Sequence, residues 1–316
     1  MKSFQIQPSL RALINARCFP SDESLGYYQS PLTGLHIMIK ELLSHAAFRF
    51  MLLALLLCGF SFNVHPQTTP VEPTPLTKTT PATNDENAEQ IVRRAIEAHG
   101  GQNYLAVRSL IGRGFFTTYA QGVSGVPLQF VDYFVFPDRE RTEFRGAGNR
   151  VIQTNVGAEG WLYDGANKSL KDMKPEQVED FRLALRTSID NVLRGWWRKE
   201  GAKLTYLGRR EAGVGRRNEA VRLTYPDGFT VDFEFDARSG LAAKTFYQRA
   251  NQEGEQVTEE DHYARHLAAS GVTVPFVIDH YRAGVQSSRI SYDSLEFNST
   301  IPDSLFTRPA NAKAVK

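Results

Sequence analysis

Strict alternation of apolar and polar residues is the feature that most limits how this chain can fold. In residues 229–235 aromatic and aliphatic side chains occupy every second position, with Thr230, Asp232 and Glu234 between them. A period of two residues places one kind of side chain on each face of a β-strand. The turn sequence from Pro226 to Gly228 joins this run to a second alternating segment, so the pair predicts a β-hairpin.

The same period recurs along most of the chain beyond residue 107. Short apolar runs are separated by turn sequences, a spacing that favours a large antiparallel sheet or barrel. We therefore predict an α+β fold with strands over residues 109–119, 126–136, 139–145, 150–156, 160–163, 221–225, 229–235, 241–247, 257–266, 274–281 and 288–297.

Two segments show a helical period instead. Residues 86–99 carry an apolar stripe and end at Gly100, which predicts a short amphipathic helix. His99 falls in its last turn, where a cation would complement the helix dipole, and we assign it no catalytic role. Residues 175–201 repeat apolar side chains every three or four positions and predict one long helix.

The long helix is apolar on two sides. Its main stripe includes Phe181, Leu185 and Trp196, and Leu193 and Trp197 extend a second side. Such a helix is either enclosed in a core or covers a hydrophobic cavity, and periodicity does not separate these two possibilities.

An apolar run near the N-terminus predicts export. Residues 50–62 follow Lys40 and Arg49, which gives the run the length and flank of a signal-peptide core. A membrane span needs about 20 residues, so the run is short for one. Residues 38–66 are therefore predicted to be a signal peptide, with an uncleaved N-terminal anchor as the alternative.

The segments on either side of this run have different compositions. Translation is predicted to begin at Met38, which leaves residues 1–37 as a misassigned or unstructured extension. Residues 67–84 contain four Pro and seven Thr and predict an extended, solvated linker. Residues 85–316 then form the folded domain.

Charge and cysteine content exclude several classes of function. The formal net charge is +2, and this surplus lies in residues 1–84, so the folded domain is formally neutral. A neutral domain lacks the excess of basic residues that nucleic-acid binding requires. Cys18 and Cys58 both precede residue 85, so the domain offers no thiol nucleophile, disulfide or thiolate-bound metal cluster.

No nucleophile elbow, dinucleotide loop or phosphate-binding lysine motif occurs in the domain. The best polar cluster joins His262 and His266, spaced as zinc ligands are on a helix, and Glu260 would share their face of a strand. Exposed neighbours favour a solvated strand face, so we predict no metal and no cofactor. A metal-dependent hydrolase that uses either histidine is the alternative. His280 is expected to be half-buried and hydrogen-bonded.

Four arginines surround a predicted hairpin loop. A solvated loop is the expectation for them, and contact with anionic lipid headgroups is the alternative. These residues are Arg209, Arg210, Arg216 and Arg217.

Taken together, residues 86–310 resemble the outer-membrane lipoprotein-sorting (Lol-type) carrier superfamily, in a divergent exported branch. The resemblance is carried by the order of the elements and by turn-and-strand patterns rather than by catalytic residues. These patterns are the helix ending at 98–101, and segments 136–141, 160–165, 271–275 and 298–306.

The resemblance implies an unclosed antiparallel β-barrel, a half-barrel, whose apolar concave face is covered by helices. Such a protein is a non-catalytic, monomeric carrier in the periplasm or cell envelope. It holds lipid or lipoprotein acyl chains and exchanges them with a membrane-bound donor or acceptor. The cavity residues expected on this basis are Phe130, Phe134, Trp161, Phe181, Leu185, Trp196, Phe233 and Phe235.

One polar residue also follows from the resemblance. In the family a strand arginine four residues after a proline holds a lid by hydrogen bonds to its backbone, and Pro137 and Arg141 match this spacing. Arg141 is therefore the expected lid latch. Envelope-stress sensors resemble the same half-barrel, so a sensor or regulatory binding domain is a further alternative.

Overall fold

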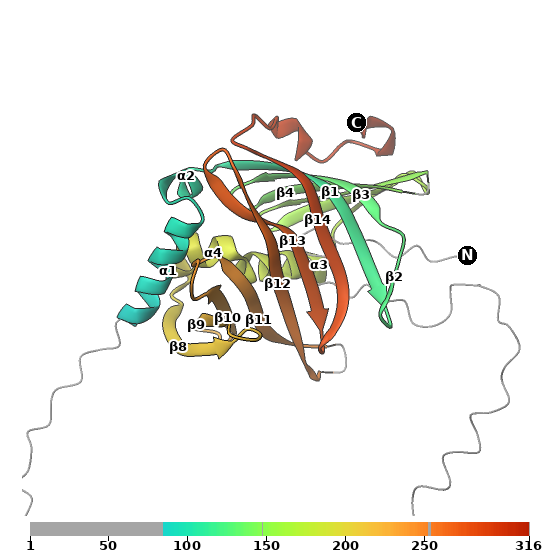
Figure 1. The fold of residues 1–316 in the computed structure, drawn as a ribbon. Helices are drawn as coiled ribbons and strands as arrows, with labels where there is room; N and C mark the ends of the chain where they lie inside the picture. The colour runs from blue at the N-terminus through green and yellow to red at the C-terminus, as the bar shows by residue number, and fades with distance from the viewer. Residues whose placement is uncertain (1–84, 147, 252–253, 316) are drawn as a thin grey trace, which may run out of the picture. The chain divides into compact units, whose positions relative to one another are not determined.

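A computed structural model describes residues 85–146, 148–251 and 254–315 (Figure 1). The extension 1–37, the signal segment 38–66 and the linker 67–84 lie outside the described residues, and what the sequence predicts for them stays a prediction. No helix in the described part of the chain is long and apolar enough to cross a membrane.

One antiparallel sheet runs through the structure in the order β7-β6-β5-β4-β3-β1-β14-β13-β12-β11-β10-β9-β8, and β2 pairs with β1. Strands β7 and β8 form its two edges, so the sheet is an unclosed half-barrel and the predicted α+β class is confirmed. The strands are β1 (Ser109–Ala120), β2 (Val123–Ser124), β3 (Leu128–Val135), β4 (Arg139–Gly146), β5 (Asn149–Val156), β6 (Glu159–Asp164), β7 (Ser169–Asp172), β8 (Lys203–Glu211), β9 (Arg217–Thr224), β10 (Thr230–Asp236), β11 (Ala242–Ala250), β12 (Gln256–Ala269), β13 (Val272–Arg282) and β14 (Val285–Phe297).

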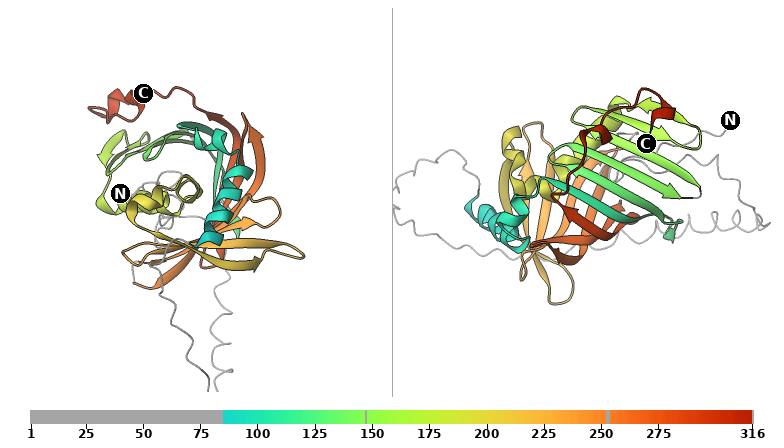
Figure 2. Two further views of the ribbon diagram at one scale, coloured as in Figure 1. Left: turned by 90° about the vertical axis from the view of Figure 1, so that its left-hand side faces the viewer. Right: turned by 90° about the horizontal axis from the view of Figure 1, so that it is seen from above.

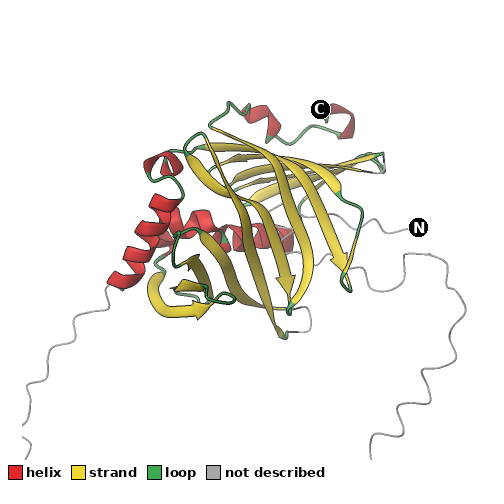
Figure 3. Cartoon of the chain, in the orientation of Figure 1, coloured by secondary structure: helices red, strands yellow, loops and turns green. Residues whose placement is uncertain are grey.

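The helical segments lie before β1 and between the two edge strands (Figure 3). A short C-terminal segment follows β14 and contains two 3-10 turns. The helices are α1 (Glu86–Ala98), α2 (Gln102–Leu105), α3 (Pro175–Thr187) and α4 (Ile189–Arg194), and the 3-10 turns are η1 (Trp196–Glu200), η2 (Asp303–Leu305) and η3 (Ala312–Ala314).

The prediction of one continuous helix over residues 175–201 is wrong. Ser188 has a ψ angle of 147° and ends α3. Its Oγ accepts a hydrogen bond from the backbone N–H of Asn191, so the same residue is the N-cap of α4. Gly195 then adopts a left-handed conformation, with φ of 71°, and ends α4.

The sheet is strongly curved. Register shifts interrupt the ladders β1–β14, β8–β9, β10–β11 and β13–β14, and such bulges bend and twist strands. At Gly114, beside the first shift, a Cβ would lie 2.0 Å from the carbonyl oxygen of Ser291, so only glycine permits this approach of β1 to β14. Figure 2 (left view) shows the resulting curve enclosing α3 and α4.

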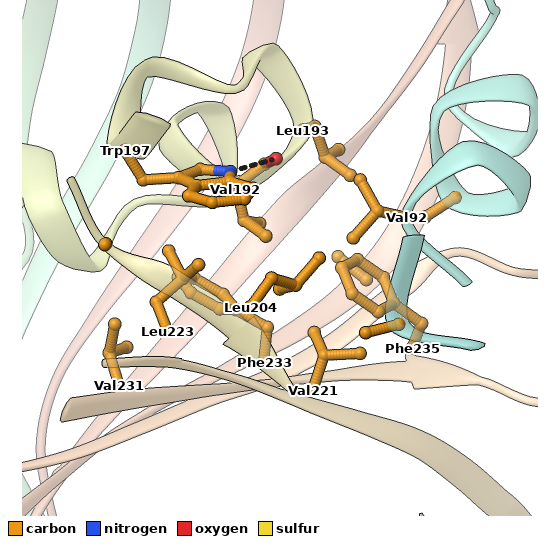
Figure 4. Packing of buried hydrophobic residues seen from close by; sticks show 14 of the residues in the cluster. Val92, Val192, Leu193, Trp197, Leu204, Val221, Leu223, Val231, Phe233 and Phe235 are labelled. Atoms are coloured by element: carbon orange, nitrogen blue, oxygen red, sulfur yellow. Dashed lines mark hydrogen bonds between the residues drawn. The ribbon is translucent and has the colours of Figure 1, made fainter. Parts of the chain in front are cut away.

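The main hydrophobic core lies at the β8–β11 end of the concave face. Helices α1 and α4 and the turn η1 cover this part of the sheet, and Trp197 donates its Nε1–H to the carbonyl of Val192 (Figure 4). Phe233 lies at the centre, with no exposed surface. The packing includes Val92, Leu193, Leu204, Val221, Leu223, Val231 and Phe235.

His99 is not the helix-end cation that the sequence predicts. Its side chain is 1% exposed, and its Nε2 accepts the backbone N–H of Ala242 at 3.1 Å. The ring proton therefore lies on Nδ1, which is 2.7 Å from the carbonyl oxygen of Thr273. Burial lowers the pKa of His99, so a neutral ring joins the end of α1 to β11 and β13.

Truncation of the core should be costly. We expect Phe233→Ala to lower the free energy of unfolding by about 3–5 kcal/mol, because it leaves a cavity where no side chain can collapse. The matched variant Phe115→Ala removes a ring that is 37% exposed on β1, and should cost within about 1 kcal/mol. Urea unfolding measures both variants, and equal losses would contradict the assignment of the core.

Acid should destabilise the fold through a second histidine, His266, which is partly buried. Burial and the nearby His99 lower the pKa of His266 to about 4, from an ordinary value of 6.5. Between these values the unfolded chain binds more protons than the folded one, so the free energy of unfolding falls as the pH falls through this window. His99 acts in the same direction.

The test compares wild type with His266→Gln by urea unfolding at about pH 7 and about pH 4.5. Wild type should lose more stability than the variant on acidification. An identical loss in the two proteins would show that His266 does not contribute.

Candidate functional site

An apolar cavity lies between the concave face of β1, β12, β13 and β14 and the helical segments α2, α3 and α4. Its volume is about 140 Å³. It is smaller than a typical small-molecule site of roughly 300–1,000 Å³, but it has the concave, mostly apolar lining of one. The sheet side of the wall includes Leu110, Ile278, Ile290, Leu295 and Phe297.

A charged group forms part of the helical wall. Arg194 on α4 donates to Asp190 Oδ1 at 2.9 Å and to the backbone carbonyls of Tyr104 and Val107, each at 3.0 Å. These carbonyls lie at the end of α2, where a helix leaves acceptors without intrahelical partners. Burial opposes the charge, but Asp190 and Tyr104 outweigh it and raise the pKa of Arg194. The guanidinium thus fixes α4 to α2 across the cavity wall.

The structure brings three of the expected cavity residues together. Phe134 on β3 packs with Phe181 and Leu185 on α3, and the first two have no exposed surface. Trp196 is tied to this group through Phe136, whose ring lies 5.8 Å from the Trp196 ring and 4.8 Å from that of Phe134. Phe136, which the sequence analysis did not single out, also lines the cavity.

Three other expected residues lie in separate clusters. Phe233 and Phe235 belong to the main core beneath α1 and α4. Phe130 lies in a smaller cluster with Phe116, Phe144 and Ile290, and only Ile290 of these lines the cavity. The concave face is therefore divided, because helices pack directly on part of it and leave the cavity at the β12–β14 part.

Trp161 lies on the opposite, convex face of the sheet. Residues that pair directly across strands point to the same face of a sheet. Trp161 pairs with Thr154, which pairs with Arg141. Phe134 pairs instead with Glu140, the neighbour of Arg141, so Phe134 and Trp161 lie on opposite faces. The Nε1 of Trp161 donates to the carbonyl of Phe306 at 3.2 Å. The C-terminal segment runs along this face, outside the curve of β3 and β4 (Figure 2, left view).

Arg141 holds a backbone segment, and that segment is the C-terminal one. Its Nη1 donates to the carbonyl oxygen of Leu305 at 2.9 Å, and its Nε and Nη2 both donate to Glu143 Oε1. Nearby, Arg139 pairs with Asp303, and Arg308 pairs with Asp172. These contacts attach the segment after β14 to β4 and β7. The helices on the concave face make none of them.

Glu143 is the centre of this convex-face network. Burial opposes its ionisation, but hydrogen bonds from Arg141 and Arg150 outweigh burial and lower the pKa of the carboxyl. A buried carboxylate of this kind depends on its cations, and removal of one cation leaves a charge that is costly to bury.

Loss of the arginine should release the chain end. We expect Arg141→Leu to lower the free energy of unfolding by about 1.5–3 kcal/mol, because Arg150 still pairs with Glu143. The variant should also speed amide hydrogen exchange in residues 303–307. Arg145→Leu is the matched control. Arg145 is 61% exposed, and its Nη2 lies 3.5 Å from Glu143 Oε2, a longer contact than the 2.7 Å of Arg141. If the two variants exchange alike in this segment, Arg141 does not hold it.

The histidine cluster does not converge on a metal. His262 Nε2 lies 2.8 Å from Glu260 Oε2, but the His266 ring lies beside His99, with 6.0 Å between ring centroids. His266 therefore does not lie with Glu260 and His262 as regular strand geometry would place it, because Arg265, with φ of 51°, distorts the strand between the two histidines. No group of three metal-ligating side chains is found within the described ranges.

The arginines of the predicted hairpin lie in or beside β8 and β9, as expected. Each forms an ion pair within the protein, which favours the solvated-loop interpretation over a lipid headgroup site. The pairs are Arg209–Glu219, Arg210–Asp232, Arg216–Asp236 and Arg217–Glu211.

A polar row at the cavity is the functional feature that the sequence analysis missed. His280 is fully buried rather than half-buried, and its Nδ1 lies 2.7 Å from Asp261 Oδ1. Asp261 lines the cavity, and Ser288 lies opposite His280 in the β13–β14 register. His280 Nε2 and Ser288 Oγ are buried without a hydrogen-bond partner. Counting alternate residues on three paired strands would find this row, once the strand order was known.

No protein family and no curated protein matches this sequence. Three solved structures are similar to it at 12–14% identity. A DUF1329 family protein from Desulfovibrio piger is 12% identical with a TM-score of 0.49, over 70% of this chain and 97% of that one. A LolA superfamily protein from Nitrosomonas europaea is 14% identical with a TM-score of 0.47, over 72% and 98%. An outer membrane lipoprotein-sorting protein domain from Vibrio parahaemolyticus is 13% identical with a TM-score of 0.47, over 70% and 97%.

The functional proposal below is argued from the cavity of this chain and its lining.

Proposed function

We propose that this protein is a cell-envelope binding protein that holds an acyl chain of a lipid or lipoprotein in the cavity beneath α4. The observation that carries the proposal is the cavity itself, with a volume of about 140 Å³ and a wall made mostly of aliphatic and aromatic side chains. Each methylene moved from water into such a site contributes about 0.8 kcal/mol. Part of one chain therefore gives useful affinity.

Binding and release involve no covalent chemistry in this proposal. The wall elements come from β1, β12, β13 and β14 on one side and from α2, α3 and α4 on the other, and no strand pairing links the two sides. Release then needs only a small displacement of the helical wall. A membrane-bound donor or acceptor would present and remove the chain, and export through the segment 38–66 would place the protein in the envelope.

Filling the cavity should abolish binding. Leu295 lines it from β14, and we expect Leu295→Trp to weaken the binding of a fluorescent fatty acid at least about tenfold, since the larger ring occupies the site of several methylenes. Fluorescence titration of the purified full chain measures the effect.

The matched control is Val285→Trp on the same strand, at a position that is 55% exposed. It should bind the probe as wild type does. Organic extraction and lipid mass spectrometry of the wild-type protein give an independent check. The proposal fails if the protein carries no acyl compound and takes up no added fatty acid, or if the two Trp variants bind equally.

A further inference from the structure

A row of three polar side chains crosses the concave face beside the cavity. Asp261 on β12 lies opposite His280 on β13, which lies opposite Ser288 on β14. The next residues on the same face, Ile278 and Ile290, line the cavity, and so does Asp261. The row therefore borders the apolar wall along two neighbouring strands.

Two atoms of this row have no partner although they are buried. His280 and Ser288 are 2% and 4% exposed, and neither His280 Nε2 nor Ser288 Oγ makes a hydrogen bond. Polar atoms in protein interiors are almost always satisfied, and an unsatisfied one is costly. Neither side chain lines the cavity itself, so a ligand head reaches these two atoms only when the wall beside Ile278 and Ile290 moves. An unpaired acceptor and an unpaired hydroxyl on adjacent strands are the partners that such a head would satisfy.

The hydrogen bond to Asp261 determines what kind of ligand fits. In the tautomer whose Nδ1–H donates to Asp261 Oδ1 over 2.7 Å, the lone pair of the ring lies on Nε2. The Ser288 hydroxyl can donate. A ligand head must therefore offer one proton and one acceptor oxygen side by side, which is the arrangement of a carboxylic acid.

We propose that His280 and Ser288 bind the carboxyl group of a free long-chain fatty acid whose tail lies in the cavity. One carboxyl oxygen shares a proton with His280 Nε2, and the other accepts the Ser288 Oγ–H. Asp261, His280 and Ser288 can make the same hydrogen bonds whether the shared proton lies on the carboxyl group or on the imidazole. Transfer of the proton to the imidazole leaves a carboxylate beside an imidazolium, so the net charge of the site does not change. This assignment rests on the proposed function, since it needs the tail in the cavity.

The surrounding charges permit a carboxyl head. Glu259 lies two residues from Asp261 on the same face, and burial raises its pKa to about 7, so much of this side chain is uncharged near neutrality. The Nε of Arg282 lies 3.7 Å from Glu259 Oε1 and supplies a positive charge at this end of the row. The same side-chain types form hydrolytic triads, but there the serine donates to Nε2, whereas here both atoms lack that bond.

The test uses displacement of N-phenyl-1-naphthylamine, an apolar dye without a carboxyl group, from the full-length protein. Lauric acid and methyl laurate have the same tail, and the ester has no proton for Nε2. We expect the acid to bind about tenfold more tightly than the ester, because the acid makes one buried hydrogen bond that the ester cannot make. The nitrogen resonance of His280 Nε2 should shift with the acid and not with the ester.

Ser288→Ala should lower the affinity for lauric acid about tenfold, because it removes the hydroxyl that donates to the carboxyl oxygen. Since Ser288 Oγ has no partner in the free protein, the variant should not lower the thermal midpoint, which a merely structural serine would do. Ser291→Ala is the control, since Ser291 lies opposite Val277 on the other face of β14 and should bind as wild type does.

The outcomes separate the two proposals. If neither lauric acid nor methyl laurate displaces the dye, the acyl-binding function itself fails. If both displace it equally and Ser288→Ala changes neither, the cavity binds acyl chains but the carboxyl assignment is overturned.

Discussion

The cavity depends on one guanidinium. Arg194 joins α4 to the carbonyls that end α2 and to Asp190 in its own helix. An aliphatic side chain in its place would leave these carbonyls without this donor and would remove the contact between α2 and α4 in the cavity wall. The buried guanidinium fixes the distance between the two elements through its hydrogen bonds.

The two faces of the sheet carry different tasks. The concave face at β8–β11 is packed with side chains from α1, α4 and η1 and supplies the main core. The same face at β12–β14 is left partly open. The convex face of β4–β7 is occupied by the C-terminal segment, which Arg141 and Trp161 hold through its backbone. Core, cavity and chain end thus use separate surfaces of one sheet.

Strand alternation predicted most of the fold, because a period of two residues is a local signal that sheet formation preserves. The helix over 175–201 was harder, although Ser188 before Asn191 and the glycine at 195 are ordinary N-cap and helix-stop signals. The cavity residues could not be selected from sequence, because Phe233 and Leu295 both face the concave side and only the position of α4 separates core from cavity. The face on which Trp161 lies could not be predicted without the pairing of β6 with β5. A shift of one residue in that pairing would move the side chain to the other face of the sheet.

The two edges of the sheet are consecutive in the chain. Strand β7 ends at Asp172 and β8 begins at Lys203, and only α3, α4 and η1 connect them. No ladder of hydrogen bonds in the described sheet joins these edges, so its curvature can open or tighten while every strand keeps its neighbours. Under the proposed function, the volume inside is set by this curvature. A change of curvature to admit a bulkier acyl chain would then have to move α3, α4 and η1, which join the two edges in the chain.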